Sequence, residues 1–311
     1  MNTDVSAEAG EGAAFDDSLR LELARGDLSL ASARPVLRHL LSGSDSGLFN
    51  DEIVARMRAM LRHLAGQMLA SMALAGGTEP TPQRTEEYLG HLLLEDGLVA
   101  HVHALSLEAQ VAGRIAARSG IDQVLSPLLQ DLAASPDEER AAAAMQVMAA
   151  QARFVRQAAR MALPPGELPP DLLHRCIQLL EEVADDFDVA EAAARTLRES
   201  YEERHTRRGR LAHLVDTLGE DETEALSIDH AGLAIFVSAL ARAAGTDREL
   251  AVLSLAENQY ARLVLSLRAA GLDRADLERQ FFLLHPDISV PGEIAQLPVP
   301  RARMLLAGDA Q

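Results

Sequence analysis

Apolar residues recur along most of this chain at spacings of three and four positions, which is the repeat of an amphipathic α-helix. The segment from about Asp51 to Ala75 shows the pattern clearly, with Asn50 placed to cap its start and Gly76 and Gly77 placed to end it. Its apolar stripe consists of Ile53, Met57, Met60 or Leu61, Leu64, Met68 and Met72. Such a stripe is typical of a core face, and its methionines would also suit a binding face. The pattern along the chain predicts an all-α fold.

A second helix is predicted to begin at Ser135, where the sequence has the form of a capping box. Ser135 would cap the helix, Pro136 would lie in its first turn and Glu138 would complete the box. Behind this start runs a narrow face of small and apolar residues: Ala141, Met145, Met148, Ala152, Val155, Ala159 and Ala162. A narrow face of small residues lets another helix approach closely, either from the same chain or from a second subunit.

Gly-x-Asp sequences separate several of the helical segments, at Gly120, Gly245 and Gly271. Glycine can adopt the left-handed conformation that ends a helix, and an aspartate two residues later can cap the next one. The segment 242–248 is echoed by 268–274, which lies 26 residues further along. Helices joined by such short turns predict stacked antiparallel hairpins, although two similar turns can also arise from turn chemistry alone.

The composition changes along the chain and predicts five segments. Residues 1–14 are rich in Gly, Ala, Ser and acidic residues and are expected to form a disordered tail. We place an N-terminal helical domain at 15–162, a Pro-rich linker at 163–171 and a C-terminal helical domain at 172–285. The spaced prolines of residues 286–311 predict an extended arm that packs on its own chain or on a neighbour. The linker is marked by Pro164, Pro165, Gly166, Pro169 and Pro170.

The charged residues exclude several function classes. All 29 basic residues are arginine, so lysine-based Schiff-base and phosphate-binding sites are absent. A net charge of −18 argues against binding to nucleic acid or to an anionic membrane. The single cysteine, Cys176, cannot form an internal disulfide and is expected to be a buried thiol. The acidic N-terminus lacks a basic leader, so we expect a soluble cytoplasmic protein.

The densest basic cluster consists of Arg204, Arg207, Arg208 and Arg210, on a long polar helix predicted from about Val189 to Leu218. Guanidinium groups on neighbouring helical positions could bind a carboxylate, a phosphate or an acidic partner helix. The alternative is a solvated helix in which the arginines pair with acidic residues one turn back: Glu199, Glu202 and Glu203.

Two carboxylate–histidine pairs have the i, i+3 spacing found in helical metal centres: Asp171 with His174, and Glu202 with His205. The further carboxylates that such a centre needs are missing from the pattern. His101 and His103 are two positions apart, so on a helix they diverge and cannot chelate together. We therefore expect no cofactor, and a metal site on these four residues remains an alternative.

The sequence Leu233-Ala-Ile-Phe-Val-Ser-Ala-Leu-Ala-Arg-Ala-Ala-Gly245 and the later segment 265–272 resemble part of a known family. They are similar to the C-terminal helical segment of an alphaproteobacterial family of helical-repeat-like proteins whose function is not established. This resemblance implies a helical array and carries over no catalytic residue.

Two functions are compatible with these patterns. The first is a non-enzymatic interaction or regulatory protein, an adaptor or scaffold, whose partner is a protein or a second copy of itself. Its basis is the lack of a recognisable catalytic motif beside long amphipathic helices. The alternative is a helical enzyme or sensor with a buried metal or small-ligand site built from histidine and acidic residues.

Overall fold

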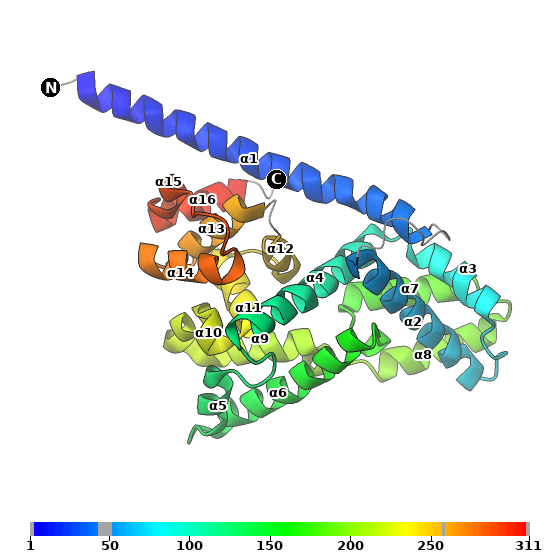
Figure 1. The fold of residues 1–311 in the computed structure, drawn as a ribbon. Helices are drawn as coiled ribbons and strands as arrows, with labels where there is room; N and C mark the ends of the chain where they lie inside the picture. The colour runs from blue at the N-terminus through cyan, green and yellow to red at the C-terminus, as the bar shows by residue number, and fades with distance from the viewer. Residues whose placement is uncertain (1–2, 43–51, 257–258, 309–311) are drawn as a thin grey trace.

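In a computed structural model that describes residues 3–42, 52–256 and 259–308, all assigned secondary structure is helical, so the all-α prediction is confirmed (Figure 1). The first part of the chain contains α1 (Thr3–Ser42), α2 (Glu52–Leu74), α3 (Pro82–Leu92), α4 (Asp96–Ser119), α5 (Pro127–Ala133), α6 (Glu138–Ala159) and the 3₁₀-helix η1 (Pro165–Glu167). The second part contains α7 (Pro170–Glu182), α8 (Phe187–Glu199), η2 (Glu203–His205), α9 (Arg207–Leu218), η3 (Gly219–Leu226), α10 (Ile228–Ala231), α11 (Leu233–Ala244), α12 (Arg248–Leu253), α13 (Tyr260–Ala269), α14 (Arg274–Leu284), α15 (Gly292–Ala295) and α16 (Val299–Gly308).

The buried apolar side chains form two clusters. The first, which we call the α2 core, takes Leu41 and the buried residues of 57–102 and 163–194, on α1–α4, α7 and α8. The second, the α11 core, takes Leu19 and Leu23 of α1, the buried residues of 104–147 on α4–α6, and those of 211–306 from α9 to α16. Helix α4 passes from one core to the other between Val102 and Ala104.

The division between the cores does not follow the predicted linker at 163–171. Each core contains residues from both sides of this segment, because α7 and α8 pack with the α2 core while α6 packs along α9 in the α11 core. The linker itself includes η1 and the start of α7. Prolines can occupy the first turn of a helix, so they mark helix starts here rather than a break between independent cores.

Both ends of the chain differ from the expected tail and arm. Helix α1 begins at Thr3, within the segment 1–14 that we expected to be disordered, and it runs along one side of the molecule (Figure 1). Alanine and glutamate favour helices, so a helix anchored by Leu19 and Leu23 can extend through such residues. The expected extended arm 286–311 is helical in α15 and α16, and α16 packs on α13 of the same chain.

Two further helix predictions need correction. Helix α2 follows its predicted range, but α6 is capped by Asp137, whose carboxylate accepts from the backbone N–H of Glu139 at 3.0 Å and of Arg140 at 3.3 Å. The predicted cap, Ser135, instead accepts from the N–H of Asp137 at 3.2 Å. The predicted long helix 189–218 is divided into α8, η2 and α9. No helix in the described part of the chain is long and apolar enough to span a membrane.

Candidate functional site

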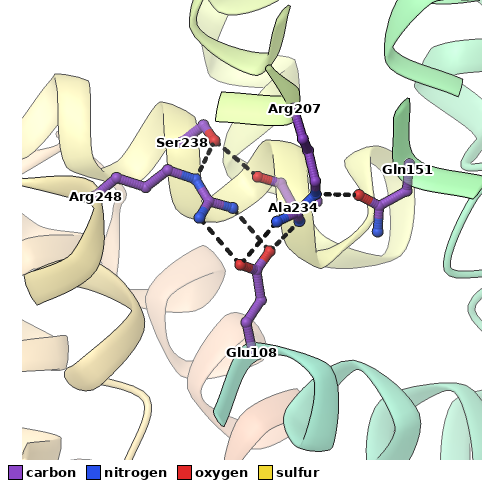
Figure 2. A network of polar contacts seen from close by, with 6 residues as sticks. All are labelled: Glu108, Gln151, Arg207, Ala234, Ser238 and Arg248. Carbon is purple, nitrogen blue, oxygen red and sulfur yellow. Dashed lines mark hydrogen bonds and ion pairs between the residues drawn. The ribbon is translucent and has the colours of Figure 1, made fainter. Parts of the chain in front are cut away.

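Three charged side chains from distant parts of the chain meet in the interior. Glu108 of α4 lies between Arg207, the first residue of α9, and Arg248, the first residue of α12 (Figure 2). Arg248 donates from both terminal nitrogens to the two carboxylate oxygens of Glu108, at 2.8 and 3.0 Å. Arg207 also donates to both oxygens, with the longer contact at 3.2 Å. We call these three residues the Arg–Glu–Arg cluster.

Neighbouring groups fix the orientation of both guanidinium groups. The Nε of Arg207 donates to the amide oxygen of Gln151 on α6 at 2.7 Å, and its guanidinium carbon lies 3.8 Å from the ring centre of Phe154. The Nε of Arg248 donates at 2.9 Å to the hydroxyl of Ser238 on α11, which donates in turn to the carbonyl of Ala234 (Figure 2). These contacts leave the two arginines little freedom, so the cluster is a rigid part of the fold.

The cluster keeps Glu108 ionised. Burial by itself raises the pKa of Glu108, but the charges of Arg207 and Arg248 and their hydrogen bonds outweigh it, and the pKa lies well below the ordinary value. A carboxylate held in this way is a poor proton acceptor. Glu108 is therefore suited to hold two guanidinium groups in place, and not to act as a general base.

A second charged group lies beside the cluster. Arg208 donates to Glu249 Oε1 at 2.7 Å, and His101 Nδ1 lies 3.3 Å from the same oxygen, without hydrogen-bond geometry. Burial raises the pKa of Glu249, whereas the contacts with His101 and Arg208 lower it, with the net result that it lies at about 2. Glu249 is thus a carboxylate at neutral pH.

The ring nitrogens of His101 are exceptional among the described side chains. The imidazole is 8% exposed; its Nδ1 has only the 3.3 Å contact with Glu249, and its Nε2 has no hydrogen-bond partner within the described residues. A buried polar group without a partner costs free energy, and in native proteins it is commonly explained by a bound water or ligand. His101 and Glu108 are seven positions apart, so they share one face of α4.

A cavity lies where these groups meet. Its volume is about 40 Å³, counted as the space that the centre of a water molecule can occupy. Its polar lining includes His101, Glu249, Arg207, Arg208 and Arg248. Its apolar lining consists of Met60, Leu105, Ala109, Phe154, Ala158, Ala162 and Leu163. Arg56, Gln157 and Glu167 complete it. The cavity is therefore lined by both charged and apolar side chains.

The cavity is lined by residues from helices of both cores. Met60 and Leu163 belong to the α2 core, whereas α9 and α12, which carry the arginines, place their apolar residues in the α11 core. The cavity lies beside α4, close to where this helix passes from one core to the other. A molecule bound there would contact elements of both cores.

The local sequence explains how Arg207 reaches the site. Thr206 caps α9, since its hydroxyl accepts from the backbone N–H of Gly209 at 3.0 Å. The backbone N–H of Arg207 donates to the carboxylate of Glu167 at 2.8 Å, which ties the start of α9 to η1. The chain turn at η2 thus fixes where the Arg207 side chain enters the interior.

The structure separates the predicted basic cluster. Arg204 is 79% exposed and pairs with Glu202 at 2.7 Å, which is one of the pairings we considered as the alternative. Arg207 is buried, and Arg208 is bound to Glu249. Arg210 donates to the backbone carbonyl of Gln146 at 3.2 Å. The break between α8 and α9 directs these side chains to different places, so they do not form the single surface that a continuous helix would give.

The predicted metal ligands lie in two separate places. Glu202 and His205 are 3.5 Å apart on the exposed turn η2, and Glu202 also pairs with Arg204. Asp171 and His174 lie on α7, where the Nε2 of His174 is 3.1 Å from the side-chain amide of Gln178. Within the described residues, no three His, Cys, Asp or Glu side chains are arranged to hold a metal ion.

Sequence reasoning missed four of the residues that make the site: His101, Glu108, Arg248 and Glu249. A signal was present for Glu108, because its neighbours one helical turn away, Ala104, Val111 and Ala112, are all core residues. A carboxylate on such a face requires a cationic partner, although the sequence does not say which arginine provides it.

Cys176 matches its prediction as a buried thiol. It is 1% exposed, and burial raises its pKa to about 12. A thiol that does not ionise at neutral pH is a poor nucleophile.

Comparisons of this chain with models of protein families, with characterised proteins and with solved structures found no match, so the resemblance of segments 233–245 and 265–272 stays a prediction.

Proposed function

We propose that this protein is a non-enzymatic regulatory protein that binds a small polar ligand in the cavity between its two cores. The observation that carries this proposal is the buried imidazole of His101, which lines the cavity and whose Nε2 has no hydrogen-bond partner within the described residues. A ligand that accepts from or donates to this nitrogen would gain the free energy of satisfying a buried polar group. Of the two functions that the sequence leaves open, the cavity favours the small-ligand sensor.

The ionised carboxylates at the site favour a binding function over a catalytic one. Glu108 and Glu249 are held ionised by arginines, so neither is suited to accept a proton at neutral pH. The described lining of the cavity offers no hydroxyl or thiol nucleophile. The site is therefore built to hold a molecule through fixed charges and one imidazole.

Regulation is favoured by the place of the cavity. Ligand sites between packed units are common, and a ligand there changes the free energy of the packing that surrounds it. A protein partner, which could be a second copy of the chain, would bind more tightly or more weakly when the ligand changes this packing. The long amphipathic helices are the basis for proposing such a partner.

The substitution His101→Leu tests the proposal. It should abolish ligand binding while keeping the melting temperature within about 3 °C of the wild type, since it removes the unpaired buried Nε2 at nearly constant volume and leaves Glu249 bound to Arg208. The matched control is His213→Leu, on the exposed face of α9. The measurement is a thermal-shift screen of small metabolites against all three proteins. A set of stabilising compounds that acts equally on the wild type and on His101→Leu would refute the proposed site.

A further inference from the structure

A second hollow, which we call the α6 groove, lies at the C-terminal end of α6. Its volume is about 460 Å³, within the range of roughly 300–1,000 Å³ that small-molecule sites have. Helix α2 contributes His63 and Gln67 to its lining. The groove shares Gln157 and Ala162 with the cavity of the proposed function, so the two spaces are neighbours with different linings.

Three arginines line the α6 groove, and its described lining contains no carboxylate. They are Arg153, Arg156 and Arg160, and none of them forms an ion pair with an acidic residue that the structure describes. The neighbouring cavity differs in this respect, because its Arg207 and Arg208 are bound to carboxylates. The groove is therefore a positively charged surface in a chain whose net charge is −18.

The position of the arginines on α6 explains how they lie together without carboxylates. They are three and four positions apart, so they share one face of the helix. Arg156 lies in the last turn and Arg160 at the C-cap, where the helix dipole favours positive charge. The Nε of Arg156 donates to the backbone carbonyl of Ala152 at 3.3 Å, while its terminal nitrogens have no partner among the described residues.

The spacing and the remaining lining indicate the class of ligand. At a rise of about 1.5 Å per residue, Arg153 and Arg160 are about 10 Å apart along the helix axis, so several anionic groups fit the row better than one. A guanidinium group binds a phosphoryl or a carboxylate group through paired hydrogen bonds. The described lining has no aromatic ring on which a nucleobase would stack, and its apolar residues are Ala162 and Pro164.

From these features we infer that the α6 groove binds a small polyanion, a molecule with two or more phosphoryl or carboxylate groups and no large apolar part. The arginines would hold the anionic groups. The neutral side chains Gln67 and Gln157 would form hydrogen bonds with the remaining polar atoms of the ligand. This site goes beyond the proposed function, since it takes a different ligand at a different place.

The test compares two polyanions, pyrophosphate and citrate, with their single-group counterparts, phosphate and acetate. Isothermal titration calorimetry of the full-length protein gives the dissociation constants. At least one polyanion should bind about tenfold or more tightly than its counterpart, because it forms additional charge-assisted hydrogen bonds. Raising the NaCl concentration from about 50 mM to about 500 mM should weaken this binding, since salt screens charges at the surface. The preference between pyrophosphate and citrate distinguishes phosphoryl from carboxylate ligands.

Two triple variants locate the binding. The groove variant carries Arg153→Gln, Arg156→Gln and Arg160→Gln, and it should lose about tenfold or more in affinity while its circular dichroism stays that of the wild type. The control variant loses the same charge at three exposed, ion-paired positions: Arg195→Gln, Arg198→Gln and Arg204→Gln. It should bind within about twofold of the wild type. Equal loss in both variants, equal binding of single anions and polyanions, or no binding of either polyanion to the wild type would overturn the groove.

The variant His101→Leu separates this site from the proposed function. His101 does not line the groove, so this variant should bind the polyanion as the wild type does. Loss of polyanion binding in His101→Leu would place the ligand in the neighbouring cavity and overturn the groove. In the metabolite screen, a polyanion that stabilises the wild type and His101→Leu equally but not the groove variant is a ligand of the groove. The other compounds of the screen then decide the proposed function separately.

Discussion

At the scale of single residues, the site depends on charges that are paired with one another within the protein. Glu108 is 1% exposed and satisfies the buried guanidinium group of Arg207 and the partly buried one of Arg248 at once. A buried ion pair adds little to stability compared with apolar residues of the same shape, but the loss of one partner leaves an uncompensated charge in the interior. The cluster therefore makes the fold sensitive to single substitutions in a way that surface ion pairs do not.

We predict that Glu108→Gln lowers the free energy of unfolding by about 3–5 kcal/mol, because Arg207 and Arg248 lose the negative charge between them. The control Glu199→Gln, on the exposed end of α8, should change it by less than about 0.5 kcal/mol. Urea denaturation followed by circular dichroism gives both values. Equal effects of the two substitutions would contradict the role assigned to Glu108.

We predict that the free energy of unfolding depends on pH through Glu249. Its pKa in the folded protein is about 2, below its ordinary value of 4.5. Its contribution is therefore fully present above pH 4.5 and is lost as the pH falls towards 2. Urea midpoints measured between pH 5 and pH 3 should fall more steeply for the wild type than for Glu249→Gln. Parallel curves would show that Glu249 is not stabilised by Arg208 and His101 as the structure indicates.

At the scale of elements, the start of α9 decides where Arg207 points. Thr206 caps the helix, and Gly209 lies so close to η2 that an added Cβ atom would come within 2.3 Å of the Glu203 carbonyl oxygen. A glycine is required at this position because the two backbones approach each other closely. The turn between α8 and α9 thus depends on a residue that carries no side chain.

Gly209→Ala should destabilise the protein by more than the roughly 1 kcal/mol that the loss of a helix cap costs, because the turn at η2 must shift to accept the methyl group. Gly113→Ala is the matched control, since Gly113 lies within α4 with no atom within 4 Å of the added Cβ. That substitution should be neutral or should stabilise α4 by up to about 1 kcal/mol. Thermal unfolding of both variants checks this prediction, and a neutral Gly209→Ala would contradict the close approach.

The helical class and a few individual helices, α2 and α6 among them, could be predicted from the sequence, but the positions of most other helices could not. The apolar period gave α2 correctly, and Gly120 and Gly245 end α4 and α11 in the left-handed conformation as expected. The break within the predicted helix 189–218 was missed because its polar residues favour a helix locally, while the tertiary contact of Arg207 with Gln151 and the local hydrogen bond from Thr206 to the Glu203 carbonyl favour the turn. Tertiary contacts decided the outcome there.

At the scale of the whole molecule, segments distant in the sequence make up each core. The site shares this property, since Glu108 lies 99 positions from Arg207 and 140 from Arg248. No local pattern connects residues at such separations, which is why the candidate site could not be assembled from spacing alone. The sequence pointed to buried histidine and acidic residues as an alternative, but it identified other members of that set.

The arrangement of the cores predicts how fragments behave. Residues 1–162 and 163–311, expressed separately, should each fail to show a cooperative unfolding transition, because each lacks part of both cores. Co-expression of the two fragments should restore helical structure and stability. Differential scanning calorimetry measures the cooperativity of unfolding, and the spread of amide chemical shifts in NMR spectra reports folded structure. A cooperative transition in either isolated fragment would show that the linker at 163–171 is a true domain boundary.

The most direct test of the central claim is native mass spectrometry of the wild-type protein and of His101→Leu, both purified gently from the same cells. If the cavity binds a ligand, the wild type and His213→Leu should each carry one small molecule per chain, seen as an increase in mass. His101→Leu should lack this increase. The same spectra report any bound protein chain or second copy. Wild-type protein without any small added mass, together with no stabilising compound in the metabolite screen, would contradict the account.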